Sequence, residues 1–303
     1  MPMIDRHLLR YFIAVVDRGN FSAAARHCKV AQPTLSVGIA RLEEEIGHRL
    51  FERTNRRVVL TPAGARLTAP ARRAENAFVD AERAVLDFAP PPTVRIGVMS
   101  TLPGAWVGEA IAHAVGSASE RVEIVEARAK DLQVLLERDR IDAAIGLRGD
   151  GPGRTLWTED YKLALSASHQ LAGRTSLRAE EISSETMFVR RSCEALPAIS
   201  RHFTGRGIRP FMAARTDNDD RAIAYVKAGL GVTMMPACFA TNGVSMVALA
   251  GFDVTRTIGV TLGAARGNLI DDCDALRRLM NALSRLAGAA GGACRTLGAG
   301  AFA

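Results

Sequence analysis

Small polar side chains gather at the start of one predicted helix. Gln32, Thr34 and Ser36 flank Pro33, which suits a first helical turn because its missing N–H would be unpaired there. Amide and hydroxyl groups of this size fit the major groove of DNA, where they can bond base edges or phosphates. Arg41 lies further along the same helix. These residues predict a DNA-contacting surface, and the alternative is that they only begin a helix.

A second, basic group surrounds a predicted hairpin. The sequence of 50–60 predicts two short strands, and Arg53, Arg56 and Arg57 lie around their tip. Guanidinium groups form strong, forked hydrogen bonds with phosphate. The hairpin therefore predicts a wing that contacts the DNA backbone or minor groove, with a solvated basic tip as the alternative.

Three short helices must position the first group. Apolar spacing predicts helices over 5–18, 21–28 and 33–46, the first ended by Gly19 and the last by Gly47. Two helices joined by a tight turn, the second beginning with small polar residues, are typical of a helix-turn-helix.

A long amphipathic helix follows the hairpin. Thr61 is placed to cap it, and the proline run at 90–92 ends it and marks a domain boundary. Its apolar stripe comprises Leu67, Ala71, Ala74, Phe78, Val85 and Phe88. A solitary helix with one such stripe predicts pairing with a second copy of the chain.

Strands and helices alternate beyond the prolines. Strands are predicted at 94–100, 121–127 and 142–147, with helices near 104–117 and 130–139. A second set has strands near 162–167, 186–190, 211–216 and 231–235, helices near 194–205 and 218–229, then a strand near 256–263 and a helix over 271–286. This alternation predicts an α/β fold with a largely parallel sheet, whose ligands bind at strand ends or between lobes.

The charge of the chain is concentrated at one end. The 303 residues suit two domains, and the net charge is +7. Residues 1–73 hold 13 Lys and Arg against 6 Asp and Glu, so the remaining residues carry no net charge. This asymmetry favours an anionic partner for the N-terminal part, either nucleic acid or a membrane surface.

Signals for catalysis, metal binding and secretion are missing from the sequence. It contains no G-x-S-x-G, P-loop or G-x-G-x-x-G motif and no metal-ligand spacing, so we expect neither an enzyme nor a cofactor. The cysteines are odd in number and include no C-x-x-C pair: Cys28, Cys193, Cys238, Cys273 and Cys294. With no signal pattern and no apolar stretch of about 18 residues, a cytoplasmic protein without membrane contact is expected.

The N-terminal residues resemble those of the LysR-type transcriptional regulators. The matching motifs are Ala24-Ala25, Gln32-Pro33-x-x-Ser36-x-x-Ile39-x-x-Leu42-Glu43, Gly47-x-x-Leu50-Phe51-x-Arg53 and Leu60-Thr61-Pro62-x-Gly64. A looser similarity continues through Arg95-Ile96-Gly97, Leu135-x-x-x-Asp139-Arg140-Ile141-Asp142 and Val226-x-Ala228-Gly229-Leu230-Gly231. Two positions depart from the family. Ala31 replaces a common Ser, and Val37-Gly38 replaces longer polar side chains, so base preference is not transferable.

The resemblance implies three parts and a tail. These are a winged helix-turn-helix over 1–60, a dimerising linker helix over 61–89 and an effector-binding domain over 93–287, followed by a disordered segment over 288–303. The effector domain would have two α/β lobes like those of type II periplasmic binding proteins, lobe I over 93–162 and 264–287 and lobe II over 163–263. Family members bind double-stranded promoter DNA as homotetramers, and a small molecule between the lobes alters DNA bending and RNA polymerase contact.

By the same resemblance the effector site draws on the ends of three strands. The residues concerned are Ser100, Thr101, Arg190, Arg191, Ser192, Asp217 and Asn218. Hydroxyls and N–H groups there can receive a carboxylate, and the two arginines favour an anionic effector. The alternatives are helix capping for the hydroxyls and surface ion pairs for the arginines.

Two other functions compete with an effector-dependent regulator. A solute-binding receptor would use only the α/β part and leave the first 90 residues unexplained. A redox-sensing regulator would use Cys193, whose position is similar to that of the reactive cysteine in peroxide-sensing relatives, with Arg190 and Arg191 lowering its pKa. Such sensors need a second cysteine shortly downstream, and 194–207 contains none.

Overall fold

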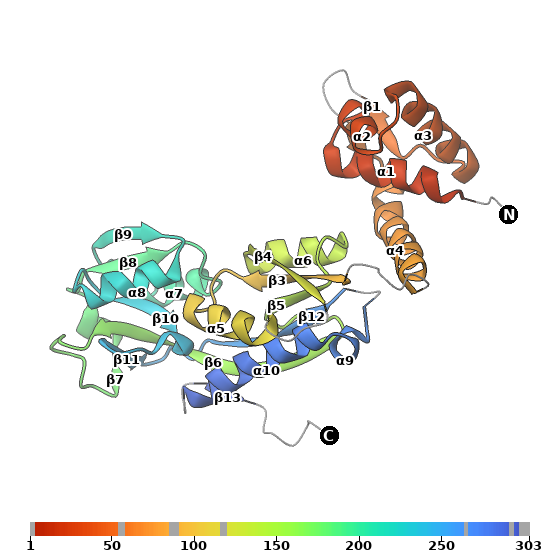
Figure 1. Ribbon diagram of the computed structural model, residues 1–303. Coiled ribbons are helices and arrows are strands. Elements are labelled where there is room, and N and C mark those ends of the chain that lie inside the picture. Colours follow the sequence, from red (N-terminus) through yellow and green to blue (C-terminus); the bar gives the residue numbers. More distant parts are fainter. Residues whose placement is uncertain are drawn as a thin grey trace. The chain divides into compact units, whose positions relative to one another are not determined.

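A computed structural model describes residues 4–53, 58–84, 91–115, 120–263, 266–290 and 294–296. The chain divides into two compact units whose boundary lies between Pro90 and Pro91, inside the predicted proline run. Each unit is described by itself below (Figure 1).

The N-terminal unit is helical apart from one hairpin. Its elements are α1 (Arg6–Arg18), α2 (Phe21–His27), α3 (Gln32–Ile46), β1 (Phe51–Arg53), β2 (Val58–Leu60) and α4 (Pro62–Ala84). Gly19 ends α1 in the left-handed conformation with φ of 69°, and the side chain of Asn20 caps α2 by accepting a hydrogen bond of 2.7 Å from the N–H of Ala23. Gly47 ends α3 with φ of 75°. The three predicted helices and the antiparallel hairpin are therefore confirmed.

One apolar core holds this unit together. Phe12, Leu35, Ile39, Leu42 and Leu50 are fully buried in it. The first part of the α4 stripe also packs here, with Ala71 buried and Leu67 and Ala74 half-buried. This corrects the expectation that the whole stripe faces a second copy, since of the described stripe residues only Phe78 is exposed. Val85 and Phe88 lie outside the described residues.

Gly64 brings the start of α4 against the start of the wing. A Cβ atom at this position would lie 2.2 Å from the backbone oxygen of Leu50. The Thr61 hydroxyl fixes the same turn, since it accepts from the N–H of Gly64 at 3.0 Å and donates to the carbonyl of Arg49 at 2.7 Å. No side chain can therefore be placed at Gly64 without moving the backbone.

Gly64→Ala should destabilise the N-terminal unit by about 1–3 kcal/mol, because the added methyl group overpacks a backbone contact. Thermal unfolding followed by circular dichroism would measure this. Gly108→Ala is the matched control, since a Cβ atom at Gly108 meets nothing within 4 Å. Equal unfolding temperatures for the two variants would contradict the close approach at Gly64.

The second unit contains a long sheet shared by two lobes. Its order is β4-β3-β5-β12-β6-β11-β7, and β10 and β13 also pair with β6. Lobe I comprises β3 (Thr93–Met99), β4 (Arg121–Ala127), β5 (Ala143–Leu147), β12 (Thr255–Leu262), the first half of β6 (Gly153–Ser166), and helices α5 (Gly104–Val115), α6 (Ala129–Glu137), α9 (Leu269–Asp272) and α10 (Asp274–Ala289). β3 pairs in parallel with β4 and β5, whereas β12 is antiparallel to β5 and β6.

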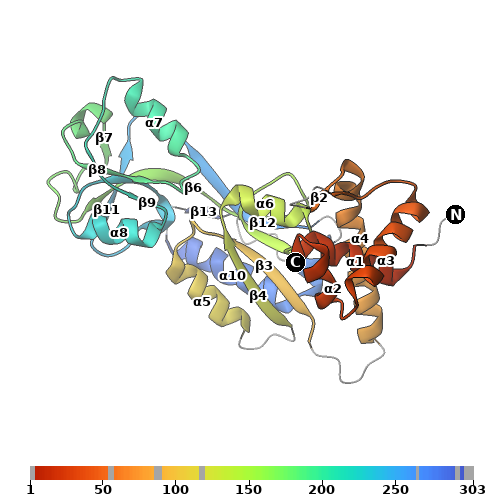
Figure 2. The ribbon, with the colours of Figure 1, turned by 90° about the horizontal axis from the view of Figure 1, so that it is seen from above.

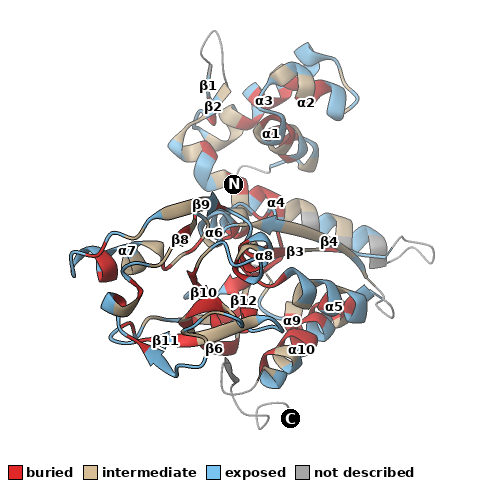
Figure 3. Ribbon diagram, turned by 90° about the vertical axis from the view of Figure 1, so that its left-hand side faces the viewer, coloured by how far each residue is buried: buried red, intermediate tan, exposed pale blue. Residues whose placement is uncertain are grey.

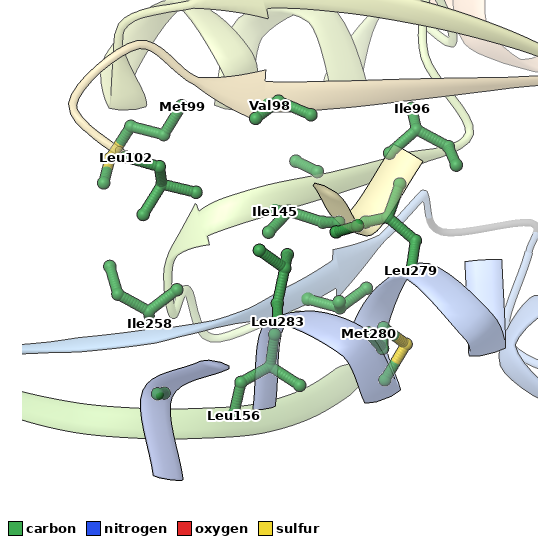
Figure 4. Packing of buried hydrophobic residues seen from close by; sticks show 14 of the residues in the cluster. Ile96, Val98, Met99, Leu102, Ile145, Leu156, Ile258, Leu279, Met280 and Leu283 are labelled. Carbon is green, nitrogen blue, oxygen red and sulfur yellow. The ribbon is translucent and has the colours of Figure 1, made fainter. Parts of the chain in front are cut away.

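Helices cover both faces of the lobe I sheet. Ile96 and Val98 of β3 share a core with Leu279 and Leu283 of α10 (Figure 4). Gly97, which points to the opposite face, would place a Cβ atom 2.6 Å from Leu132 of α6. α5 and α10 lie side by side on their face (Figures 1 and 2).

Lobe II comprises the second half of β6 and the elements that follow it. These are β7 (Ser176–Leu177), a 3₁₀ turn at Ala179–Ile182, β8 (Met187–Arg190), α7 (Leu196–Thr204), β9 (Met212–Thr216), α8 (Asp219–Lys227), β10 (Thr233–Pro236), a 3₁₀ turn at Ala237–Phe239 and β11 (Val244–Leu249). β8 and β9 are parallel, and β10 and β11 are antiparallel to β6. Figure 3 shows the buried residues of this unit concentrated along its central strands.

Three features of this unit differ from the sequence prediction. β6 begins nine residues before the predicted start at 162, and β7, β11 and β13 were not predicted. β12 belongs to lobe I, because its residues pair with β5, so the predicted lobe II boundary at 263 lies too late. The predicted disordered tail over 288–303 is partly ordered: α10 extends to Ala289, and β13 (Cys294–Thr296) pairs with β6.

Candidate DNA-binding and effector-binding sites

The first turns of α3 carry the predicted DNA-contacting residues on their surface. Gln32, Pro33 and Thr34 are exposed and Ser36 is half-buried. The Gln32 amide donates to the Ser36 hydroxyl at 2.8 Å, so these two side chains form one polar unit. Arg41 is exposed too, but its guanidinium is bonded to Glu45 one turn further on at 2.9 Å.

The two departures from the family pattern have visible consequences. Ala31 occupies the N-cap position of α3 without a side-chain cap. Val37 is 69% exposed on the same surface, so α3 presents an isopropyl group beside its polar residues. Gly38 lets α1 approach closely, because a Cβ atom there would lie 2.6 Å from the Tyr11 ring. The sequence analysis treated Val37 only as a departure from the family and gave it no role, although an apolar residue between polar ones at the front of this helix was an available signal.

The wing is tied to α3 through Glu43. Its carboxylate accepts from the backbone N–H groups of Leu50 at 2.7 Å and Phe51 at 3.2 Å, at the entry to β1. Arg53 ends β1, and its side chain is outside the described residues, as are Arg56 and Arg57. The structure therefore confirms the hairpin and leaves the arginine contacts as a prediction.

The two lobes of the second unit meet at Arg256, near the start of β12. This side chain is 4% exposed. Its guanidinium donates to Glu159 of β6 at 3.0 Å, to Glu194 before α7 at 2.6 Å, and to the hydroxyl and carbonyl oxygens of Thr101 after β3, both at 3.2 Å. One buried cation thus joins the β3 end of lobe I to the β8–α7 connection of lobe II.

Arg256 keeps the Glu194 carboxyl charged. Burial alone would raise the pKa of Glu194, but the Arg256 guanidinium and the hydrogen bonds to Tyr161 and Arg256 prevail and hold this pKa below the usual range. Glu159 also accepts from the indole N–H of Trp157 at 3.1 Å and the N–H of Cys238 at 2.6 Å. Two carboxylates therefore already bond Arg256.

A buried hydroxyl next to this network lacks a partner. The Ser100 hydroxyl, which precedes Thr101, has no hydrogen-bond partner within 3.5 Å in the described part of the chain. Tyr161 is also buried here: its ring lies 5.9 Å from the Arg256 guanidinium, its hydroxyl interacts with the Glu194 carboxylate, and burial raises its pKa. A hydroxyl buried without a partner is unfavourable, so Ser100 is placed to bond a polar ligand atom.

A second polar contact joins the lobes at the start of α5. The N–H of Gly104 donates to the Asp220 carboxylate at 3.2 Å. Asp220 lies in the first turn of α8, so the N-termini of two helices share one anion.

Arg190 corrects the predicted effector site. It is 2% exposed and forms an ion pair with Asp219, and it also donates to the carbonyl of Met234 at 3.0 Å. Burial alone would lower the pKa of Arg190, but the Asp219 charge outweighs it and raises this pKa. The guanidinium is thus engaged inside lobe II.

The other predicted effector residues lie nearer the surface. Arg191, Asp217 and Asn218 are exposed and Ser192 is half-buried. Asn218 caps α8 by accepting from the N–H of Arg221 at 2.8 Å. With Arg190 and Arg256 already paired, the preference for an anionic effector now depends on Arg191.

Cys193 is a buried thiol rather than an activated one. It is 6% exposed, and burial raises its pKa despite the nearby Arg190 charge. Arg190 does act to lower this pKa, as expected, but burial outweighs it and the net shift is upward. Among the described cysteines, Cys28, Cys193, Cys238 and Cys273 form no disulfide. Among the described side chains, no three His, Cys, Asp or Glu residues are grouped as a metal site would need.

Comparison with known proteins identifies two domains. Residues 7–65 match the family described as bacterial regulatory helix-turn-helix protein, lysR family, and residues 89–269 match the LysR substrate binding domain. A probable hydrogen peroxide-inducible genes activator of Mycobacterium avium is 32% identical, over 75% of this chain and 76% of the relative. The transcriptional regulator BenM of Acinetobacter baylyi is 31% identical, over 77% and 80% of the two chains.

A solved structure has the same fold. Full-length OxyR from Pseudomonas aeruginosa, in a single-residue variant, superimposes with a TM-score of 0.67 at 22% identity, covering 93% of this chain and 95% of that one. In the part of the chain that the structure describes, every helix is too short or too polar to cross a membrane.

Proposed function

The chain belongs to the LysR family of DNA-binding transcriptional regulators, and we propose that an effector bound between its two lobes sets how it binds promoter DNA. The family consists of regulators rather than enzymes. The observation that carries the proposal is the partnerless buried hydroxyl of Ser100, next to Thr101 of the Arg256 network that joins the lobes.

DNA binding is proposed to use the exposed front of α3. Gln32, Thr34 and Ser36 would contact base edges, and the uncapped N–H groups after Ala31 would bond a phosphate. Val37 would contact a thymine methyl group. Arg53, Arg56 and Arg57 would contact phosphates or the minor groove.

The effector is proposed to bond Ser100, Tyr161 and Ser192, with Arg191 for any anionic group it carries. Thr101 and Glu194 would respond to it, because both already bond Arg256 across the lobes. A ligand that binds one arrangement of the two lobes more tightly than another shifts the population toward that arrangement, and these contacts would change with it. Asp217 and Asn218 would line the solvent-facing side of the effector site.

Assembly through the linker helix is part of the proposal. Phe78 of α4 is 47% exposed, under the guanidinium of Arg6 at 4.9 Å, and a second copy could cover it. We propose a homodimer through α4 and a homotetramer on DNA, with RNA polymerase contact once bound.

A gel shift with the DNA upstream of the protein's own gene tests the proposal. A specific, salt-sensitive shift is expected, because Arg contacts to phosphate release counterions. A solute-binding protein would give none. Small molecules that are substrates or products of the enzymes encoded by neighbouring genes can be titrated into the same assay to show whether an effector changes the shift. The Ser100→Ala variant should keep basal DNA binding and lose the response to the effector.

Ser36→Ala should change the preference among bases by about 1–3 kcal/mol, because it removes a hydroxyl from the groove-facing side of α3. Competition of the wild type and the variant for a panel of single-base operator variants would measure this. Ser168→Ala, the same change at an exposed serine of lobe II, is the control. If both variants rank the panel as the wild type does, Ser36 is not a base contact.

A further inference from the structure

Lobe II contains a cavity that the proposed effector site does not use. It has a volume of about 230 Å³ and lies between α7 and the strands β8, β9 and β10. Its walls are largely apolar and include Phe188, Leu196, Ile199, Phe203, Ile208 and Met212. Protein interiors are close-packed, so an opening of this size between a helix and its sheet is unusual.

The polar groups in the inner wall are already satisfied. Arg190 is paired with Asp219 and the Met234 carbonyl. The Thr233 hydroxyl donates to the carbonyl of Phe188 at 2.8 Å. A buried ligand would find no free hydrogen-bonding group in these two side chains, so a polar or charged group inserted here would lose its water without compensation.

The rim of the cavity is apolar on one side. Pro210 and Met212 line the cavity, and Phe211 between them is 73% exposed. Ser200 and Arg209, on other parts of the lining, are exposed. The lining therefore extends to an exposed, partly apolar segment of the lobe II surface.

The size of the cavity limits its occupant. Apolar cavities of about 150 Å³ stay dry and take up benzene. A volume of 230 Å³ accommodates one ring with a short substituent, and it is below the roughly 300–1,000 Å³ of sites for larger ligands.

We propose that this cavity is a second ligand site, for a small uncharged apolar molecule of about one aromatic ring. It is separate from the junction at Arg256, but its wall includes Cys193, whose neighbour Glu194 bonds Arg256. A molecule in the cavity therefore lies one residue from the contact that joins the lobes.

Binding of toluene to the full-length chain, followed by calorimetry and thermal unfolding, tests the site. The wild type should bind toluene and unfold at a higher temperature with it, since a ligand that binds only the folded state stabilises it. Benzylammonium, similar in size but positively charged, should bind at least about tenfold more weakly, because its ammonium group would be buried beside the Arg190 and Arg209 guanidiniums of the lining. Absence of toluene binding, or equal affinity for benzylammonium, would overturn the proposal.

Two variants place the binding in this cavity. Ile199→Phe should fill the space, and Ser200→Trp should block it from an exposed position where misfolding is not expected. Each should weaken toluene binding by at least about tenfold, since a filled cavity offers the ligand no contacts. Ser168→Trp, the same change at an exposed serine outside the lining, should bind toluene as the wild type does. Unchanged affinity in Ser200→Trp and folded Ile199→Phe would place the ligand elsewhere.

Discussion

Arg256→Ala should lower the free energy of unfolding of the effector domain by about 3–5 kcal/mol. The substitution deprives Glu159 of its guanidinium partner, and the Glu159 side chain is fully buried. It also removes the donor that joins Thr101 to Glu194. The large effect is the cost of leaving a buried charge without its counterion, rather than the net value of the ion pair.

Urea unfolding followed by tryptophan fluorescence measures this change in the right domain. The chain has two tryptophans, and Trp106 and Trp157 both lie in lobe I, with ring centroids 6.0 Å apart. Arg278→Ala is the control, because Arg278 pairs with Asp274 on the surface of α10 and such pairs contribute only about 0–1 kcal/mol. Similar urea midpoints for the two variants would mean that Arg256 does not hold the lobes.

Local signals predicted the DNA-binding unit almost completely. Gly19, Asn20 and Gly47 act on their own turns, so the ends of the first three helices follow from a few neighbouring residues. The two wing strands were predicted correctly because the residues that pair in them are close in sequence. The packing of Leu67 and Ala74 against the core of the same unit was missed, since an apolar stripe does not identify what covers it.

The lobe junction could not be predicted because its partners are distant in sequence. Arg256 and Glu159 are 97 residues apart, and Arg256 and Thr101 are 155 apart. The first half of β6 was not predicted, because it contains Glu159 and Asp160 and acidic residues are rarely buried in a strand. Arg256 arrives from β12 to supply the positive charge beside Glu159, and the N–H groups of Trp157 and Cys238 complete its hydrogen bonds.

Arg190→Ala should be far more destabilising than Arg191→Ala, although the two arginines are adjacent. Successive side chains point to opposite sides of extended chain, and here Arg190 is 2% exposed while Arg191 is exposed. Arg190→Ala would leave the Asp219 carboxylate buried without its partner and lower the free energy of unfolding by about 3–5 kcal/mol. Arg191→Ala should change it by no more than about 0.5 kcal/mol. Urea unfolding of both variants checks this, and equal midpoints would contradict the buried ion pair.

Removing both charges together tests whether Arg190 and Asp219 interact directly. Arg190→Met combined with Asp219→Leu should be more stable than the sum of the single changes predicts, because neither ion is then left alone in the interior. Additive single and double effects would show that the two side chains do not interact. Arg191→Ala tests the other arginine. If the effector is anionic, this variant should bind it more weakly, whereas the double variant Arg190→Met with Asp219→Leu should still respond to it. That result would assign a structural role to the Arg190–Asp219 ion pair and effector binding to Arg191.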